Sequence, residues 1–142
     1  MTSHSNTRHN KVWINGTFDV LHPGHVKLFR YARMLAGQNG SVHLGIDEDA
    51  RVSKAKGPSR PINDLQTRIS NILSITKLDS ITSFATDKQL KSIICDLKPQ
   101  YMVIGDDYRD KPIIGASCIE EIFYVTRDDN SSTKIINELD LD

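Results

Sequence analysis

Short apolar runs alternate with helix-like patterns along this chain, and this alternation limits its possible folds more than any other feature. In the helix-like segments, apolar residues recur at the i, i+3, i+4, i+7 spacing of one helix face. Strands that alternate with helices in this way predict a parallel sheet with right-handed crossovers, and hence an α/β fold. The predicted strands are residues 11–15, 41–46, 81–84, 101–104 and 121–125, and the predicted helices are residues 23–36, 64–76, 87–97 and about 132–139.

The chain has the size of one domain, which we place at residues 11–142. Residues 1–10 are polar and without periodicity, so we expect a disordered terminus or the remnant of an expression tag. Residues 47–63 are rich in charge, Gly and Pro and show no apolar period, which predicts a long loop. Long loops in compact domains are often functional.

Charge and composition exclude several classes of function. Lys+Arg and Asp+Glu number 18 each, and aromatic residues make up 6% of the chain, which argues against nucleic-acid binding. No apolar run approaches the about 18 residues of a membrane span, and no signal-peptide core follows Met1, so we expect a cytoplasmic protein without a membrane partner.

Cys95 and Cys118 lie far apart in the sequence and outside metal-type spacing, which predicts free thiols in a reducing compartment.

The most informative stretch directly follows the first predicted strand and reads GTFDVLHPGH, residues 16–25. Ligands of doubly wound sheets bind beyond the carboxyl ends of the strands, which is where this loop must lie. Pro23 suits the first turn of a helix, so His22 falls near its cap and His25 one turn further on. Gly24 leaves the backbone open to a phosphate, which the amides of a helix start attract. The stretch therefore predicts a phosphate-binding site.

These histidines allow two other interpretations. His22 and His25 have a spacing that zinc ligands can use, but His43 lies on another strand and neither cysteine is local. We therefore predict no metal held by protein ligands alone. A bare H-x-x-H also fits two unrelated surface histidines, but the whole ten-residue run does not.

The run resembles the signature of the cytidylyltransferase-like nucleotidyltransferases, in which H-x-G-H follows the first strand. The resemblance covers about residues 11–140. The second mark of that family, often written I-S-T-T, is matched by Ser131, Ser132 and Thr133, with Asn130 in the place of the isoleucine and a segment from Arg127 that is one residue shorter than R-T-E-G-I. The resemblance implies a Rossmann-like three-layer sandwich with a five-stranded parallel sheet, and a homodimer. Without it, Ser-Ser-Thr would be read as an ordinary helix N-cap.

The resemblance also implies a reaction, the transfer of NMP from a nucleoside triphosphate to a phosphorylated small molecule with release of pyrophosphate. The acceptor phosphate attacks the α-phosphorus in line, and Mg²⁺ accompanies the triphosphate. His22, His25 and Lys56 would be catalytic. The nucleotide would be bound by Gly16, Thr17, Phe18, His22, Gly24, His25, Lys54, Asp107, Arg127, Ser131, Ser132 and Thr133, and the acceptor by Asp19, Lys56, Arg68 and Lys88.

Several of these residues have an alternative interpretation. Lys54 and Lys56 lie in residues 47–63, where a solvated basic loop is the ordinary reading, and the resemblance favours Lys56 over Lys54 as the lysine near the α-phosphate. Arg68 matches an arginine that reaches the site in relatives, but a structural ion pair is an equal alternative. Lys88 is the weaker candidate for the acceptor phosphate.

The substrate signals conflict. KGPSRPINDLQTR, residues 56–68, is very like the loop of bacterial heptose 1-phosphate adenylyltransferases. In contrast, IGDDY, residues 104–108, and Arg127 are closer to glycerol-3-phosphate cytidylyltransferases. We favour CMP transfer from CTP to a polyol or sugar phosphate, with an ATP-dependent heptose 1-phosphate adenylyltransferase as the alternative and a non-catalytic nucleotide-binding module as the second. FAD synthetases of the archaeal type and pantetheine-phosphate adenylyltransferases share the H-x-G-H logic.

Overall fold

The sheet in the computed structural model, which describes residues 9–126, is parallel throughout. Its strand order is β3-β2-β1-β4-β5. This confirms the predicted five-stranded parallel sheet, with each strand within one or two residues of its expected bounds. The strands are β1 (Lys11–Gly16), β2 (Ser41–Asp47), β3 (Ser80–Phe84), β4 (Tyr101–Gly105) and β5 (Glu121–Val125).

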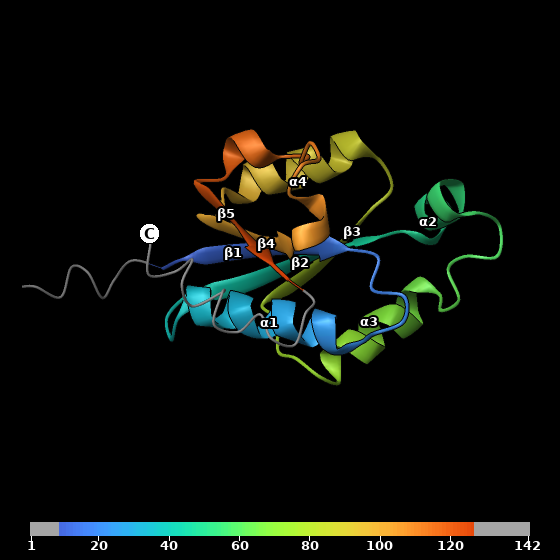
Figure 1. The fold of residues 1–142 in the computed structure, drawn as a ribbon, viewed down its shortest axis with the longest axis horizontal. Helices are drawn as coiled ribbons and strands as arrows, with labels where there is room; N and C mark the ends of the chain where they lie inside the picture. The colour runs from blue at the N-terminus through green and yellow to red at the C-terminus, as the bar shows by residue number, and fades with distance from the viewer. Residues whose placement is uncertain (1–8, 127–142) are drawn as a thin grey trace, which may run out of the picture.

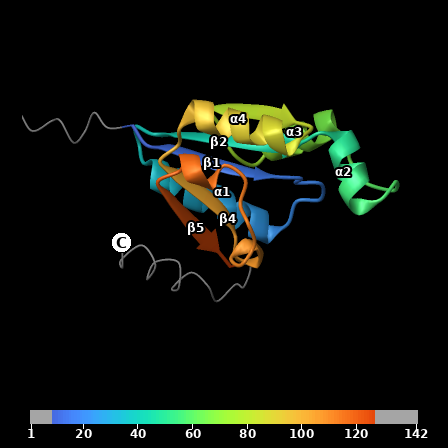
Figure 2. The same cartoon turned by 90° about the horizontal axis from the view of Figure 1, so that it is seen from above.

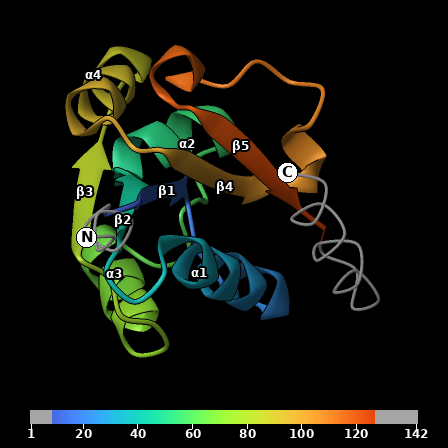
Figure 3. The same ribbon diagram turned by 90° about the vertical axis from the view of Figure 1, so that its left-hand side faces the viewer.

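Helices cover both faces of this sheet, as a Rossmann-like three-layer sandwich requires (Figures 1 and 3). Helices α1 (Pro23–Ala36) and α3 (Leu65–Leu73) lie on one face, and α4 (Asp87–Leu97) lies on the other. One core cluster joins the sheet to α1 and α3, and a second one, around Trp13, joins it to α4. Both faces of the sheet are therefore buried, which explains why the strands read as continuous apolar runs.

The strand order reverses between β1 and β4. The chain leaves β1 for β2 and β3 on one side, and returns through α4 to β4 on the other. Such a switch point separates the loops that follow the two central strands and opens a crevice at their carboxyl ends. The GTFDVLHPGH stretch follows β1 and therefore lies at this crevice.

The long loop predicted at residues 47–63 is wrong in part, because it contains α2 (Asp49–Lys56). Val52 is the buried residue of this helix, so no apolar period marks it in the sequence. Polar contacts hold it instead. Arg51 pairs with Asp47 one turn earlier, and Gly57, at φ +107°, ends the helix in a conformation that favours glycine. Figure 2 shows α2 projecting beyond the carboxyl edge of the sheet.

The expectation of free thiols is also wrong, because Cys95 and Cys118 form a disulfide. Cys95 lies on α4, and Cys118 ends the short 3₁₀ helix η3 (Ala116–Cys118) that precedes β5. The connection from β4 to β5 returns across α4 and brings the two Cα atoms to 5.1 Å. Sequence separation alone does not reveal this approach.

The predicted last helix at about 132–139 lies outside the described residues, as do Arg127, Ser131, Ser132 and Thr133. Among residues 9–126, no helix combines the length and the hydropathy that crossing a bilayer requires.

Candidate active site

A cavity of about 490 Å³ lies at the carboxyl ends of β1 and β4. It brings together residues of the loop after β1, the start of α1, the end of β2, α2, and the connection between β4 and β5. Of the residues predicted to bind nucleotide or acceptor, the cavity is lined by Gly16, Thr17, Phe18, Asp19, His22, Gly24, His25, Lys56 and Asp107.

The two histidines are fixed by the first turn of α1. His22 is the N-cap residue and accepts a hydrogen bond on Nδ1 from the Gly24 amide at 3.0 Å. The His22 amide donates in turn to Nδ1 of His25 at 3.3 Å, and the two rings stack at 3.8 Å between centroids. An amide can only donate, so each neutral ring carries its proton on Nε2. The turn therefore sets both rings in the tautomer in which Nε2 can donate to a phosphate oxygen.

The start of α1 adds a partial positive charge beside these two hydrogen-bond donors. The first turn of α1 holds no acidic residue, so no carboxylate there neutralises the partial charge of its amides. Pro23 occupies the first helical position, where a missing N–H costs nothing, and Gly24 leaves the backbone uncovered. An anion can therefore approach the amides and the histidines together.

Phe18 supports the site from below. Its backbone φ of +50° is unusual for a residue other than glycine, asparagine or aspartate, and its ring is buried. The ring meets His25 edge-on at 5.2 Å and Phe29 at 5.6 Å between centroids. Gly16 makes room for this arrangement, because a Cβ there would lie 3.2 Å from the Phe18 ring. Gly16 therefore leaves space for the Phe18 ring, and this ring packs against His25.

Arg68 is fully buried, with 0% of its surface exposed. Its guanidinium donates to the carbonyl oxygens of Asn63, Thr17 and Asp47, and to the Asp49 carboxylate at 2.6 Å. These partners belong to the loop after β1, the end of β2, the start of α2 and the segment before α3. The contacts favour the structural ion pair over the acceptor-binding role that the resemblance implied.

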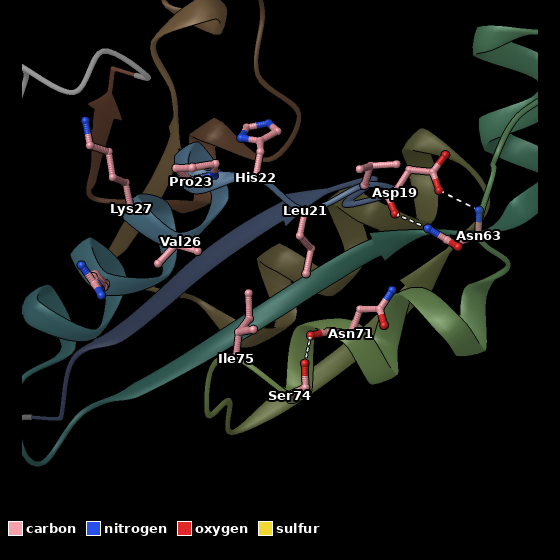
Figure 4. Close-up of a pocket in the computed structure, with 12 residues that line it drawn as sticks. Asp19, Leu21, His22, Pro23, Val26, Lys27, Asn63, Asn71, Ser74 and Ile75 are labelled. Atoms are coloured by element: carbon pink, nitrogen blue, oxygen red, sulfur yellow. Dashed lines mark hydrogen bonds between the residues drawn. The ribbon is translucent and has the colours of Figure 1, made fainter.

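Asp19 holds the segment between α2 and α3. Its carboxylate accepts the amides of Ile62 at 2.7 Å and Asn63 at 2.8 Å, and its carbonyl accepts from the Asn63 side chain (Figure 4). Burial alone would raise the pKa of Asp19. The two amide hydrogen bonds, together with the charges of Arg68 and Arg60, outweigh burial and bring the pKa below its ordinary value. Both carboxylate oxygens of Asp19 thus hold the segment between α2 and α3 by accepting its amides.

The predicted lysines fall in different places. Lys56, the last residue of α2, lines the cavity, and Lys54 is exposed and does not. Lys88 lies on α4 beside a separate hollow of about 510 Å³. Ile113 and Ile114 line both hollows and so form the partition between them.

Among the charged residues that line the cavity, sequence reasoning assigned no role to Asp47 and Arg51, and it placed Arg60 only in a basic loop. Asp47 accepts from the Thr17 hydroxyl at 2.8 Å and from Arg51 at 2.8 Å, so it joins the ends of β1 and β2 to α2. Arg51 also bonds Asp87 at 2.7 Å. The i, i+4 spacing of Asp47 and Arg51 was the available signal for this pair.

A third hollow, of about 780 Å³, is larger but more open, and it lies along α1 and α3 (Figure 4). It shares Asp19, Val20 and His22 with the cavity described above. We place the chemistry in the smaller cavity, because it holds both histidines, Gly24 and Lys56. Within the described part of the chain, His, Cys, Asp and Glu side chains form no group of three or more that could hold a metal ion.

Comparison with known proteins agrees with this geometry. The model of the cytidylyltransferase-like family matches residues 13–138. "Bifunctional protein HldE" of Gluconacetobacter diazotrophicus is 32% identical over 130 residues, covering 88% of this chain and 26% of that protein. The protein of the same name from Campylobacter jejuni subsp. doylei is 35% identical over 130 residues, covering 90% and 27%. The chain thus spans about a quarter of the length of these relatives.

Two solved structures share the fold. A lipopolysaccharide core biosynthesis protein from Thermoplasma volcanium superimposes with a TM-score of 0.63 at 17% identity, over 81% of this chain and 95% of that one. A protein of unknown function from Archaeoglobus fulgidus gives 0.56 at 24% identity, over 70% and 72%. Fold, histidine turn and family model agree, and the chain belongs to the cytidylyltransferase-like family of nucleotidyltransferases.

Proposed function

We propose that this chain transfers AMP from ATP to a sugar phosphate of the heptose 1-phosphate type and releases pyrophosphate. The stacked pair His22 and His25 at the open start of α1 carries the proposal of nucleotidyl transfer, because it offers donors where an α-phosphate gains charge. The similarity to the HldE proteins supports the adenylyl reading better than CMP transfer to a polyol phosphate. The likeness of residues 56–68 to the heptose 1-phosphate adenylyltransferases points the same way.

In this mechanism an oxygen of the acceptor phosphate forms a bond to the α-phosphorus of ATP. The bond from that phosphorus to the bridging oxygen breaks on the opposite side, and pyrophosphate leaves. Nε2 of His22 and of His25 donates to the α-phosphate oxygens as their charge grows. The chain forms no covalent bond to substrate, so its contribution is positioning and charge stabilisation.

The cationic side of the cavity is formed by α2 and the loop that follows. Lys56 and Arg60 line the cavity, and Asp19 and Arg68 hold the segments on either side of them. We assign Lys56 to the α-phosphate and the acceptor phosphate, where it draws the two anions together. Lys54 and Lys88 remain weaker proposals, because Lys54 does not line the cavity and Lys88 lines the neighbouring hollow. Asp107 lines the cavity and stays a proposal for the nucleotide side of the site.

Mg²⁺ fits this site as a companion of the triphosphate. The protein offers no group of three ligands among its described residues, and Mg²⁺ is commonly held by one or two carboxylates together with substrate phosphates. Three carboxylates of the described residues line the cavity, and both oxygens of Asp19 already accept backbone amides, so Asp47 and Asp107 are the residues that would hold the ion together with the phosphates. When bound, the ion shields the charge of the triphosphate.

The test is a pyrophosphate-release assay with ATP or CTP and a panel of acceptors that contains heptose 1-phosphate and glycerol 3-phosphate. We expect release with ATP and the heptose phosphate. Release with CTP and glycerol 3-phosphate would restore the cytidylyl reading. No release with any pair, despite nucleotide binding, would favour the non-catalytic module. The homodimer implied by the resemblance stays a prediction, which light scattering decides.

A further inference from the structure

The connection between β4 and β5, residues 106–120, forms one wall of the cavity. Asp107, Tyr108, Pro112, Ile113 and Ile114 line it from this side, opposite the histidine turn and α2. The wall is not part of the sheet. Its position therefore depends on how the connection is attached to the rest of the molecule.

The far end of the connection lies against α4. Gly115, at φ +84°, comes so close that a Cβ there would meet Ile94 at 2.8 Å. Ile113, Ile114 and Ile119 pack on the same core cluster as Ile94. The backbone hydrogen bonds of residues 113–119 close turns inside the connection, from Ala116 to Ile113, from Cys118 to Gly115 and from Ile119 to Ala116. Apolar packing and the disulfide from Cys118 to Cys95 thus attach this stretch to α4.

We propose that the Cys95–Cys118 disulfide is a redox-controlled latch that holds the wall formed by Pro112, Ile113 and Ile114 against the nucleotide. Reduction leaves the wall attached by packing alone, so it opens locally and the affinity for nucleotide falls. The identity of the ligand rests on the proposed function. The opening of the wall does not, because it follows from the attachment of residues 106–120.

The reducing partner is a dithiol. One of its thiolates attacks Sγ of one cysteine, forming a mixed disulfide and expelling the other cysteine as a thiolate. The second thiol of the partner then displaces the first cysteine. The partner leaves as a disulfide, and Cys95 and Cys118 take up its two electrons and two protons. Both cysteines are partly exposed and their neighbours Asp96 and Ser117 are exposed, so a dithiol can reach the bond.

The position of the latch explains why reduction acts on the cavity rather than on the whole fold. Strands β1, β2, β3 and β5 and helix α1 lie outside the segment between Cys95 and Cys118. A crosslink limits the freedom of the chain between its ends most strongly, which here includes β4 and the connection. Segments whose backbone hydrogen bonds are only local open before global unfolding, and residues 113–119 are such a segment once the disulfide is broken.

The experiment compares the oxidised chain with the chain reduced by dithiothreitol. Hydrogen exchange is followed peptide by peptide, and ATP affinity is titrated with Mg²⁺ present. We expect faster exchange in residues 106–120, unchanged exchange in β1 and β2, and an affinity lower by at least about fivefold. Reoxidation restores both. The single variants Cys95→Ser and Cys118→Ser should behave like the reduced chain in either buffer and no longer respond to dithiothreitol.

Several outcomes would overturn the latch. Alkylation of both cysteines by iodoacetamide before any reduction would show that the bond is absent. Equal exchange in residues 106–120 in the two states would show that the wall does not depend on it. A uniform rise of exchange over the whole chain would reduce the disulfide to a general stabiliser. If ATP binds in neither state while residues 106–120 still exchange faster on reduction, the proposed function fails and the latch stands.

Discussion

At the scale of single residues, His22 and His25 each accept a hydrogen bond from a backbone amide of the turn they share. The backbone therefore sets the position of both imidazole rings. A His22 side chain that accepts the Gly24 amide caps α1, and a His25 ring that accepts the His22 amide closes the same turn. One pair of residues thus starts the helix and sets the tautomer of the donors. The two roles can be separated by substitution.

His25→Ala should leave a folded protein with about 10²- to 10³-fold lower turnover, because a donor to the transition state is lost. His22→Ser should lose activity to a similar extent but keep an N-cap acceptor, whereas His22→Ala should also lose about 1 kcal/mol of stability. Pyrophosphate release and chemical denaturation measure the two effects. His9→Ala, an exposed histidine at the other end of β1, is the matched control. Turnover within a few-fold of the parent in all three variants at positions 22 and 25 would refute the mechanism.

Arg68→Met should lower the free energy of unfolding by about 2–4 kcal/mol, because it leaves the carbonyl groups of Thr17, Asp47 and Asn63 without their buried donor, whereas the half-exposed Asp49 carboxylate keeps its contact with water. The exposed Arg30→Met is the control, with an expected change within about 0.5 kcal/mol. Denaturant unfolding followed by circular dichroism gives both values. If Arg68→Met instead folds normally and only raises KM for the acceptor, the acceptor-binding role implied by the resemblance is right.

At the scale of elements, α2 shows what a sequence pattern cannot reveal. Its single buried residue, Val52, produces no period, and the contacts that fix the helix come from Arg68 and Asp87, far away in the sequence. The strands and the other described helices were predictable because each packs two or more apolar residues against the core clusters. A helix held by polar contacts to distant residues becomes visible only once the fold has brought those residues together.

Lys56→Ala should reduce kcat/KM by at least about tenfold while leaving stability nearly unchanged, because Lys56 is exposed at the end of α2. Lys77→Ala, in the connection between α3 and β3, is the control for the loss of one positive charge. Lys54→Ala distinguishes the two lysines considered for the role. A larger loss in Lys54→Ala than in Lys56→Ala would transfer the role to Lys54, contrary to the position of the two side chains.

The attachment of the α2–α3 segment to Asp19 predicts an acid sensitivity. The pKa of Asp19 is lowered in the fold, so its contribution to stability is present above its unfolded pKa of about 3.9 and is lost as the pH falls through the folded value. The parent should therefore lose stability below about pH 4 more steeply than Asp19→Asn, which cannot ionise at this position. Thermal unfolding between about pH 3 and pH 6 measures the two slopes, and parallel curves would contradict the prediction.

At the scale of the whole molecule, the sequence predicted the sheet and the place of the site for one physical reason. Buried parallel strands must be apolar, and the loop after the first of them must lie at the switch point, so GTFDVLHPGH could be assigned to a crevice without coordinates. The disulfide could not be assigned, because it depends on how the β4–β5 connection crosses α4. Arg68 was ambiguous for the same reason, since only the fold surrounds it with carbonyl groups.

The choice between ATP and CTP is a property of the whole cavity, and the sequence motifs gave conflicting predictions for it. The triphosphate is common to all nucleotides, so the histidine turn cannot select the base, and selection falls to groups on the opposite wall. Tyr108 lines that wall with 47% of its surface exposed, and Lys111 lies 5.1 Å from the centre of its ring. A ring in this position can stack on a base, and the larger adenine ring gains more from stacking than cytosine does.

ATP with Mg²⁺ should therefore raise Tm more than CTP does at equal concentration. A ligand at 100 times its Kd stabilises a fold by about 2.7 kcal/mol, which corresponds to roughly 5–10 °C for a domain of this size. Tyr108→Ala should narrow the difference between the two nucleotides, since stacking on one base is worth about 1–3 kcal/mol, and Tyr108→Phe should keep it because the ring remains. A larger shift with CTP in the parent would reverse the assignment to cytidylyl transfer. The roles of His22, His25 and Lys56 would stay the same, because they act on the phosphates that both nucleotides share.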